Sequence, residues 1–203
     1  MANPKIKNEL PELEELRAKH PYKGTHFKNM KTHPVHLRPL RGTSGVWFDL
    51  AGNKTIEAHV SEIPPSGKSQ KHRHMLEAII YVVMGRGHSL IHKQANDKPT
   101  RVDWSEGDMF SPPLNWWHQH FNDDPKKPAR YLAITNLGFM KTMGMATKEQ
   151  APAEMQTATL RAAAKKPTKK RAPAKKRASV KTKAKRASPP RGRAAKKPVK
   201  RSR

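Results

Sequence analysis

The apolar and polar positions between Val46 and Leu137 follow a pattern typical of short β-strands separated by tight turns. Apolar residues alternate with polar ones or form short runs, and Gly, Pro and Asn stand between them. The expected strands lie in VWFDL, KTIEAHVSEI, AIIYVVM, HSLIH, SEGDMFSPPLNWWHQHFN and ARYLAITNL. This spacing predicts an all-β domain, an antiparallel sandwich or barrel. We expect Tyr81 and Met84 to lie in its core.

The regions that flank these strands differ from them in composition. PELEELRAKH predicts a short helix that has Leu13 and Leu16 on one side and ends before Pro21. All Trp, Tyr and Phe residues precede Leu160, so only the preceding part can bury a core. The expected organisation in chain order is an N-terminal arm (1–44), a β-barrel (45–140), a linker (141–159) and a disordered tail (160–203).

Charge changes this picture only at the tail. The chain has 203 residues and a formal charge of +26, and residues 160–203 hold 20 Lys and Arg with no Asp or Glu. The other 22 basic and 16 acidic residues give residues 1–159 a charge of only +6. The chain has no Cys, which excludes disulfides, thiolate metal sites and cysteine nucleophiles. No signal peptide or membrane span is recognisable, so we expect a cytoplasmic protein.

Two stretches carry candidate metal chemistry. In the first, KHRHMLEAIIYVVMG, strand alternation puts His72 and His74 on one face and Arg73 on the other. The second is GDMFSPPLNWWHQHFN, which places His118 and His120 on one strand face. Both stretches together resemble the paired motifs of the cupin superfamily, G(x)5HxH(x)3–4E(x)6G and G(x)5PxG(x)2H(x)3N. The resemblance implies a single jelly-roll barrel.

Three positions depart from the cupin motifs, and the first is Gly67, which comes one residue too close to His72. Asn115 stands where Gly is usual, and Asn is the best substitute for Gly where φ is positive. The usual glutamate position falls on Ala78, while Glu77 comes one residue early. A one-residue slip turns a strand side chain to the opposite face, so Glu77 could be a ligand only if a bulge re-aimed it.

A closer resemblance accounts for the missing carboxylate. HRHMLEAIIYVVMG and WHQHFN are similar to segments of gentisate 1,2-dioxygenase and related ring-cleaving dioxygenases, whose first motif also lacks the glutamate. The resemblance implies iron ligands at His72, His74 and His118, and a homo-oligomer. Those enzymes carry two cupin modules, however, and this chain has room for one.

The residue types agree with a metal site. Three neutral imidazoles suit Fe, Zn, Cu or Ni, and without a carboxylate the ion keeps its charge and open positions for a small anion. We favour one divalent ion, Fe(II), with Zn, Mn or Ni as alternatives. For His120 we weigh two roles evenly: acid–base catalysis or support of the metal ligands, and a polar core residue with satisfied hydrogen bonds. We expect Trp116 and Trp117 to have packing roles. We expect four further residues to lie on the surface rather than at the barrel mouth: Glu57, His59, His88 and His92.

The tail, AAAKKPTKKRAPAKKRASVKTKAKRASPPRGRAAKKPVKRSR, resembles the tails of linker histones. It has no aromatic residue, so it cannot offset its chain entropy by packing or stack on bases. Its charge predicts non-specific nucleic-acid binding and nucleoid association. An anionic membrane surface, polyphosphate or a merely solvated tail remain alternatives.

Three functions follow from these observations. The leading hypothesis is a mononuclear non-haem Fe(II) dioxygenase-like cupin that acts on a small anionic substrate, such as an aromatic hydroxy acid. The second is a non-catalytic metallocupin that senses a small ligand. The third is a nucleoid-associated protein whose barrel serves oligomerisation. Fold alone does not choose among them.

Overall fold

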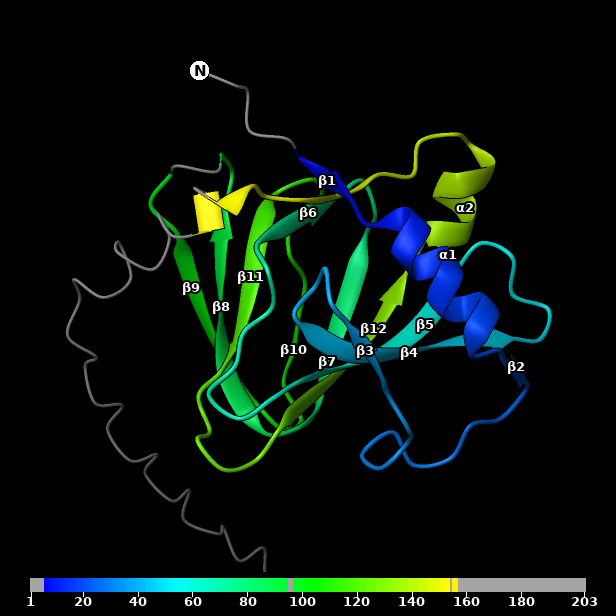
Figure 1. Ribbon diagram of the computed structural model, residues 1–203, viewed down its shortest axis with the longest axis horizontal. Coiled ribbons are helices and arrows are strands. Elements are labelled where there is room, and N and C mark those ends of the chain that lie inside the picture. Colours follow the sequence, from blue (N-terminus) through cyan, green and yellow to red (C-terminus); the bar gives the residue numbers. More distant parts are fainter. Residues whose placement is uncertain (1–5, 95–96, 154, 157–203) are drawn as a thin grey trace, which may run out of the picture. The chain divides into compact units, whose positions relative to one another are not determined.

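The computed structural model describes residues 6–94, 97–153 and 155–156, which form two facing β-sheets with helices α1 (Leu10–Lys19) and α2 (Leu137–Thr142) packed against them (Figure 1). The first sheet has six strands in the order β1 (Lys7–Asn8), β13 (Lys148–Gln150), β6 (His72–His74), β11 (Trp117–Asn122), β8 (Arg86–His92) and β9 (Thr100–Ser105). The second has seven, of which six run in the order β10 (Met109–Phe110), β7 (Ala78–Met84), β12 (Ala129–Thr135), β5 (Glu57–Ile63), β4 (Thr43–Leu50) and β2 (Tyr22–Gly24). The seventh, β3 (His36–Arg38), pairs with β4.

These sheets confirm the all-β barrel predicted from the sequence. The described strand pairs are antiparallel except for β2 and β4, which run parallel. Segments outside the predicted barrel also contribute strands: β1, β2 and β3 come from the N-terminal segment, and β13 comes from residues after α2. Strands of two or three residues are too short for alternation to reveal them.

The expectation that Tyr81 lies in the core is wrong. Along β7 the side chains of Ala78, Ile80 and Val82 are buried, whereas Ile79 is 51% and Tyr81 46% exposed. The run AIIYVVM is apolar on both faces, so its composition does not reveal that its outer face is open. Met84 is partly buried.

The orientation of the polar side chains of strand β5 also differs from expectation. Its polar residues Glu57 and His59 are buried, not on the surface. Ala58 and Val60 pack with Val46 and Phe48 in a cluster that is covered by N-terminal residues: Tyr22, Phe27, Met30 and Val35. The apolar face of β5 therefore lies under the N-terminal segment, and its polar face lines the barrel interior.

The predicted helix in the N-terminal segment is confirmed as α1. Leu13 is fully buried in a cluster with Trp47 of β4, Leu76 and two residues of α2, Leu137 and Met140. This cluster joins both helices to the barrel. No helix in the described part of the chain is long and apolar enough to cross a membrane. The expected tail, 160–203, lies outside the described residues.

Candidate metal centre

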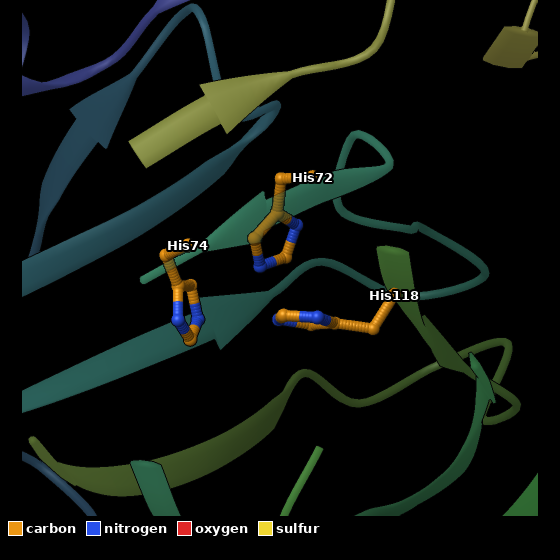
Figure 2. A group of neighbouring side chains, drawn as sticks. All are labelled: His72, His74 and His118. Atoms are coloured by element: carbon orange, nitrogen blue, oxygen red, sulfur yellow. The ribbon is translucent and has the colours of Figure 1, made fainter. Parts of the chain in front are cut away.

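Three histidines from two neighbouring strands converge inside the barrel. His72 and His74 lie on the same face of β6, and His118 of β11 is the register partner of His72. One ring nitrogen from each lies within 4.8 Å of the others, and all three side chains are buried. Figure 2 shows the three rings pointing toward a common point. We call these residues the histidine triad.

Backbone carbonyls fix the orientation of each ring. Nδ1 of His72 lies 2.8 Å from the carbonyl oxygen of Gln70, Nδ1 of His74 lies 3.0 Å from that of Leu76, and Nδ1 of His118 lies 2.8 Å from that of Trp116. A carbonyl only accepts, so each Nδ1 carries the proton and donates it. Each Nε2 then keeps its lone pair. This is the arrangement in which imidazoles bind metals, with the second nitrogen tied to an acceptor.

The triad is electrically neutral before any ion binds. Burial lowers the pKa of His118 to about 3, although its bond to the Trp116 carbonyl acts in the opposite direction. Burial also lowers the pKa of His72 and His74 well below 6.5, and the positive charge of Arg41 adds to this effect. Metal ligation requires neutral imidazole, so no proton must leave these residues at neutral pH.

The second motif holds the triad in place through its loops. Asn115 has φ +59°, as expected for a residue in the usual glycine position, and its N–H donates to the carbonyl of His74 over 3.1 Å. Asn122 at the end of β11 is buried, and its side-chain amide donates to the carbonyls of Ile63, Pro64 and Lys127. Asn122 therefore ties the end of β5 to the loop that contains Lys127 and has a structural role.

No carboxylate joins the triad within the described residues. Glu77 is exposed, and its Oε2 accepts a hydrogen bond from Asn136 over 3.0 Å. Ala78, at the usual glutamate position, is buried and lines the cavity beside the triad. The chain thus places a methyl group where the general cupin motif places a ligand.

The triad opens onto a small cavity of about 30 Å³. This volume suffices for roughly two water molecules, since each needs about 10–15 Å³. Its walls are polar and cationic, with Arg38, Arg41 and Lys148 beside His59 and Tyr131. We call this space the metal chamber.

Sequence reasoning missed the three cationic residues of the chamber. Arg38 lies at the end of β3, Arg41 in the following turn, and Lys148 in β13, all in segments read as arm or linker. In a chain with 42 Lys and Arg, nothing local distinguishes them. Burial and the charges of Arg41 and Arg38 lower the pKa of Lys148 well below 10.5.

Arg41 faces the chamber with unused hydrogen-bonding capacity. Its Nη2 lies 2.7 Å from Oε2 of Glu9, but its Nε and Nη1 are buried without a hydrogen-bond partner. Such donors are costly to bury unless a ligand satisfies them. Arg38 also contacts Glu9, over 3.4 Å, and lies over the ring of Trp47.

His120 takes the opposite tautomer to the triad. Trp104 Nε1 donates to Ser89 Oγ over 3.0 Å, and Ser89 Oγ lies 2.8 Å from Nδ1 of His120. Because Ser89 is fully buried and its oxygen already accepts from Trp104, its hydroxyl hydrogen is satisfied by donating to Nδ1. The proton of the neutral His120 ring then lies on Nε2, which makes this nitrogen a donor.

The remaining sequence candidates lie away from the triad or support it. His59 lines the chamber and stacks on Trp47, with ring centroids 5.0 Å apart. His88 and His92 alternate with Ser89 and so lie on the other face of β8, where His88 contacts Asp123. The surface position expected of His92 is wrong, because its side chain is buried. Trp117 packs under Arg73 in the role expected of it.

Residues 59–135 match the family model of the cupin domain. The barrel has the cupin fold. A 5-aminosalicylate 1,2-dioxygenase from Comamonas sp is 30% identical over 98 residues, which are 48% of this chain and 24% of the dioxygenase. The chain thus spans about a quarter of the length of that relative.

Two solved structures are similar at lower identity. A salicylate 1,2-dioxygenase from Pseudaminobacter salicylatoxidans is 23% identical with a TM-score of 0.45, over 74% of this chain and 39% of that one. A cupin-2 domain from Rhodospirillum rubrum is 23% identical with a TM-score of 0.46, over 67% of this chain and 78% of that one.

Proposed function

We propose that the protein is a mononuclear non-haem metal cupin, most consistent with an Fe(II) dioxygenase-like enzyme that acts on a small anion. One divalent ion, Fe(II) in preference to Zn, Mn or Ni, would be held by His72, His74 and His118. The observation that supports this proposal is the set of three Nε2 lone pairs, each oriented by an Nδ1–H bond to a backbone carbonyl. An iron ion in an all-imidazole site would supply a redox-active Lewis acid with open positions.

The surrounding charge supports a small anion as the class of substrate. The triad contributes no negative charge, and Arg41 presents two unpartnered N–H groups at the chamber. A carboxylate or enolate bound there would accept those hydrogen bonds and offset the charge of the ion and the guanidinium. A 2-hydroxybenzoate fits this description. That the 30%-identical relative is a 5-aminosalicylate dioxygenase agrees with this class.

His120 would act as a donor in this site. Its ring lies 5.4 Å from that of His118 and 5.8 Å from that of His72, measured between centroids. Because Ser89 occupies Nδ1, the Nε2–H can donate to an oxygen of a bound anion and hold it in place. This proton-holding role would support the hypothesis from the sequence that His120 takes part in the reaction.

Oxygen consumption tests the enzymatic part of the proposal. The full chain is reconstituted with Fe(II) without air, and 2-hydroxybenzoate and 2,5-dihydroxybenzoate are added in aerated buffer at an oxygen electrode. We expect substrate-dependent uptake that is lost in His118→Ala and kept in His88→Ala, a matched histidine on the outer face of β8. Tight binding of these acids without uptake would instead favour the ligand-sensing alternative.

A second part of the proposal concerns residues 160–203. Their 20 Lys and Arg without a single acidic residue support non-specific binding to nucleic acid through phosphate contacts. In this view the tail holds the barrel near nucleic acid and takes no part in its chemistry.

A further inference from the structure

Large apolar side chains stand together on the outer face of the second sheet. Tyr81 of β7 is the register partner of Met109 of β10, and Ile79 of β7 is that of Ile134 of β12. Register partners share one face of a sheet, so these four side chains form one surface. We call this surface, with two loop residues beside it, the open face; its members and their exposed fractions are Ile56 47%, Ile79 51%, Tyr81 46%, Met109 69%, Leu114 47% and Ile134 40%.

The adjoining part of the same sheet is already covered. Val60 of β5 belongs to a cluster against which Tyr22 and Phe27 of the N-terminal segment pack, and Leu132 of β12 packs there too. Ile134, two residues further along β12, lies outside this cover. An apolar sheet face is stabilised by a further layer packed on it, and the chain supplies that layer for only part of the sheet.

The open face has the area that one half of a protein interface needs. Side chains with these exposed fractions present roughly 600 Å² of apolar surface, the upper end for the largest patch of an ordinary monomer. Contact between two such faces buries roughly 1,200 Å², which is the lower limit for specific association between proteins. A contact of this size is expected to have a dissociation constant on the order of micromolar.

The open face is nearly uncharged, and this restricts what it can contact. It borders a hollow in which Glu77 is the charged lining residue, and Glu77 accepts a hydrogen bond from Asn136. Nucleic acid and anionic membrane surfaces are bound through cations, and the open face has none. At a two-fold axis a surface meets itself, so any charge there would face an identical charge. A face without charges avoids this repulsion and suits a second copy of the chain.

The open face also combines a projection with the hollow. Met109 is 69% exposed, and methionine adapts to irregular apolar space. It lies opposite Tyr81, whereas the hollow begins at Ile79. The hollow measures about 470 Å³, and its walls include the apolar side chains of Ile56, Ile79, Leu114 and Ile134. In a two-fold contact the projection of each copy meets the hollow of the other.

We propose that two copies of the chain associate through the open face, with Met109 of each copy in the hollow of the other. The hollow shares two wall residues with the metal chamber, Ala78 and Thr135. Met109 of the second copy therefore covers the outer side of a wall of the chamber and excludes water from it. This association goes beyond the proposed function and does not depend on a bound metal.

Sedimentation velocity of the full chain tests the association, at about 300 mM salt so that the charges of residues 160–203 are screened. We expect wild type to pass from monomer to dimer as its concentration rises through the micromolar range. Met109→Asp puts a carboxylate in each hollow and Ile79→Lys an ammonium, so each variant should dimerise at least roughly a hundredfold more weakly. Leu37→Asp is the matched control: Leu37 is 70% exposed but lies in β3, at the other end of the sheet, and this change should leave the dimer intact.

Mixing the two variants tests the contact between Met109 and the hollow. A dimer of one Met109→Asp chain and one Ile79→Lys chain has one native contact and one contact in which the carboxylate meets the ammonium. We expect the mixture to form dimers that neither variant forms alone. Recovery of dimers also shows that both variants are folded, as expected for changes at exposed positions.

Three results would contradict the proposal. A wild type that stays a monomer up to about 100 µM would show that the open face does not bind a second copy and leave it to a different partner. A dimer that survives Met109→Asp would place the interface elsewhere on the chain. A mixture of the two variants that stays monomeric would overturn the contact between Met109 and the hollow.

Discussion

Replacing Glu9 by glutamine should destabilise the fold substantially at neutral pH. Removal of one partner from a buried ion pair costs about 3–5 kcal/mol, because the other charge stays buried without compensation. Arg38 keeps a second carboxylate, Glu12, at 3.3 Å, so the loss falls mainly on Arg41. We therefore expect a loss at the lower end of this range, which is about 3 kcal/mol of unfolding free energy. For a domain of this size that corresponds to a fall in Tm of roughly 6–12 °C.

The difference between wild type and Glu9→Gln should depend on pH in a defined direction. Burial alone raises the pKa of Glu9, but the charges of Arg41, Arg38 and Lys148 outweigh it and hold the pKa below 4.5. A carboxyl whose folded pKa is depressed stabilises the fold above its unfolded pKa, and this contribution disappears as pH falls through the folded pKa. The two proteins should thus differ by a constant amount from pH 6 to 8 and converge below about pH 4.5.

Urea unfolding followed by tryptophan fluorescence measures both effects. The titrations are run with a chelator present, so that metal binding does not add to stability, at pH 7.0, 5.5, 4.5 and 3.5. Glu15→Gln is the matched control: it lies on the adjacent helix α1, is exposed, pairs with Lys19 of that helix and should leave the midpoint unchanged. The reasoning fails if Glu9→Gln is as stable as wild type at pH 7, or if acid does not narrow their difference.

Two further predictions concern positions outside the chamber. Glu77→Gln should leave bound metal unchanged by elemental analysis, because its carboxylate contacts Asn136 on the surface; loss of metal would show that Glu77 is a ligand. Truncation after Thr159 should remove binding to duplex DNA, measured by fluorescence anisotropy, while the barrel keeps its metal. With the tail present and about six to ten phosphates contacted, affinity should fall roughly 10³–10⁵-fold between 50 and 200 mM salt. An unchanged salt slope after truncation would place the nucleic-acid site on the barrel.

Sequence reasoning succeeded where the relevant information is local. The positions of His72 and His74 on one strand face follow from alternation, and the positive φ of Asn115 follows from its place in the second motif. The outward direction of Glu77 follows from a slip of one residue against Ala78. Each of these depends on neighbours along the chain, so spacing and strand period are enough to predict them.

Sequence reasoning failed where segments distant along the chain determine whether a side chain is buried. Glu57 and His59 look like surface residues in an alternating strand, but the N-terminal segment covers the other face and turns them inward. Arg41 and Lys148 reach the chamber from segments that contribute only short strands and turns, and Glu9 follows a two-residue strand. Pairing over such distances leaves no periodic signal in the sequence.

The metal content of the purified full-length chain tests the central claim most directly. Samples incubated with Fe(II), Zn(II) or Mn(II) and then desalted are measured by elemental analysis. The account predicts about one ion per chain in wild type and in His88→Ala, and loss of most of that metal when the histidine triad is replaced by alanine. A triad variant that retains as much metal as wild type, or a wild type that retains none of the three ions, would contradict it.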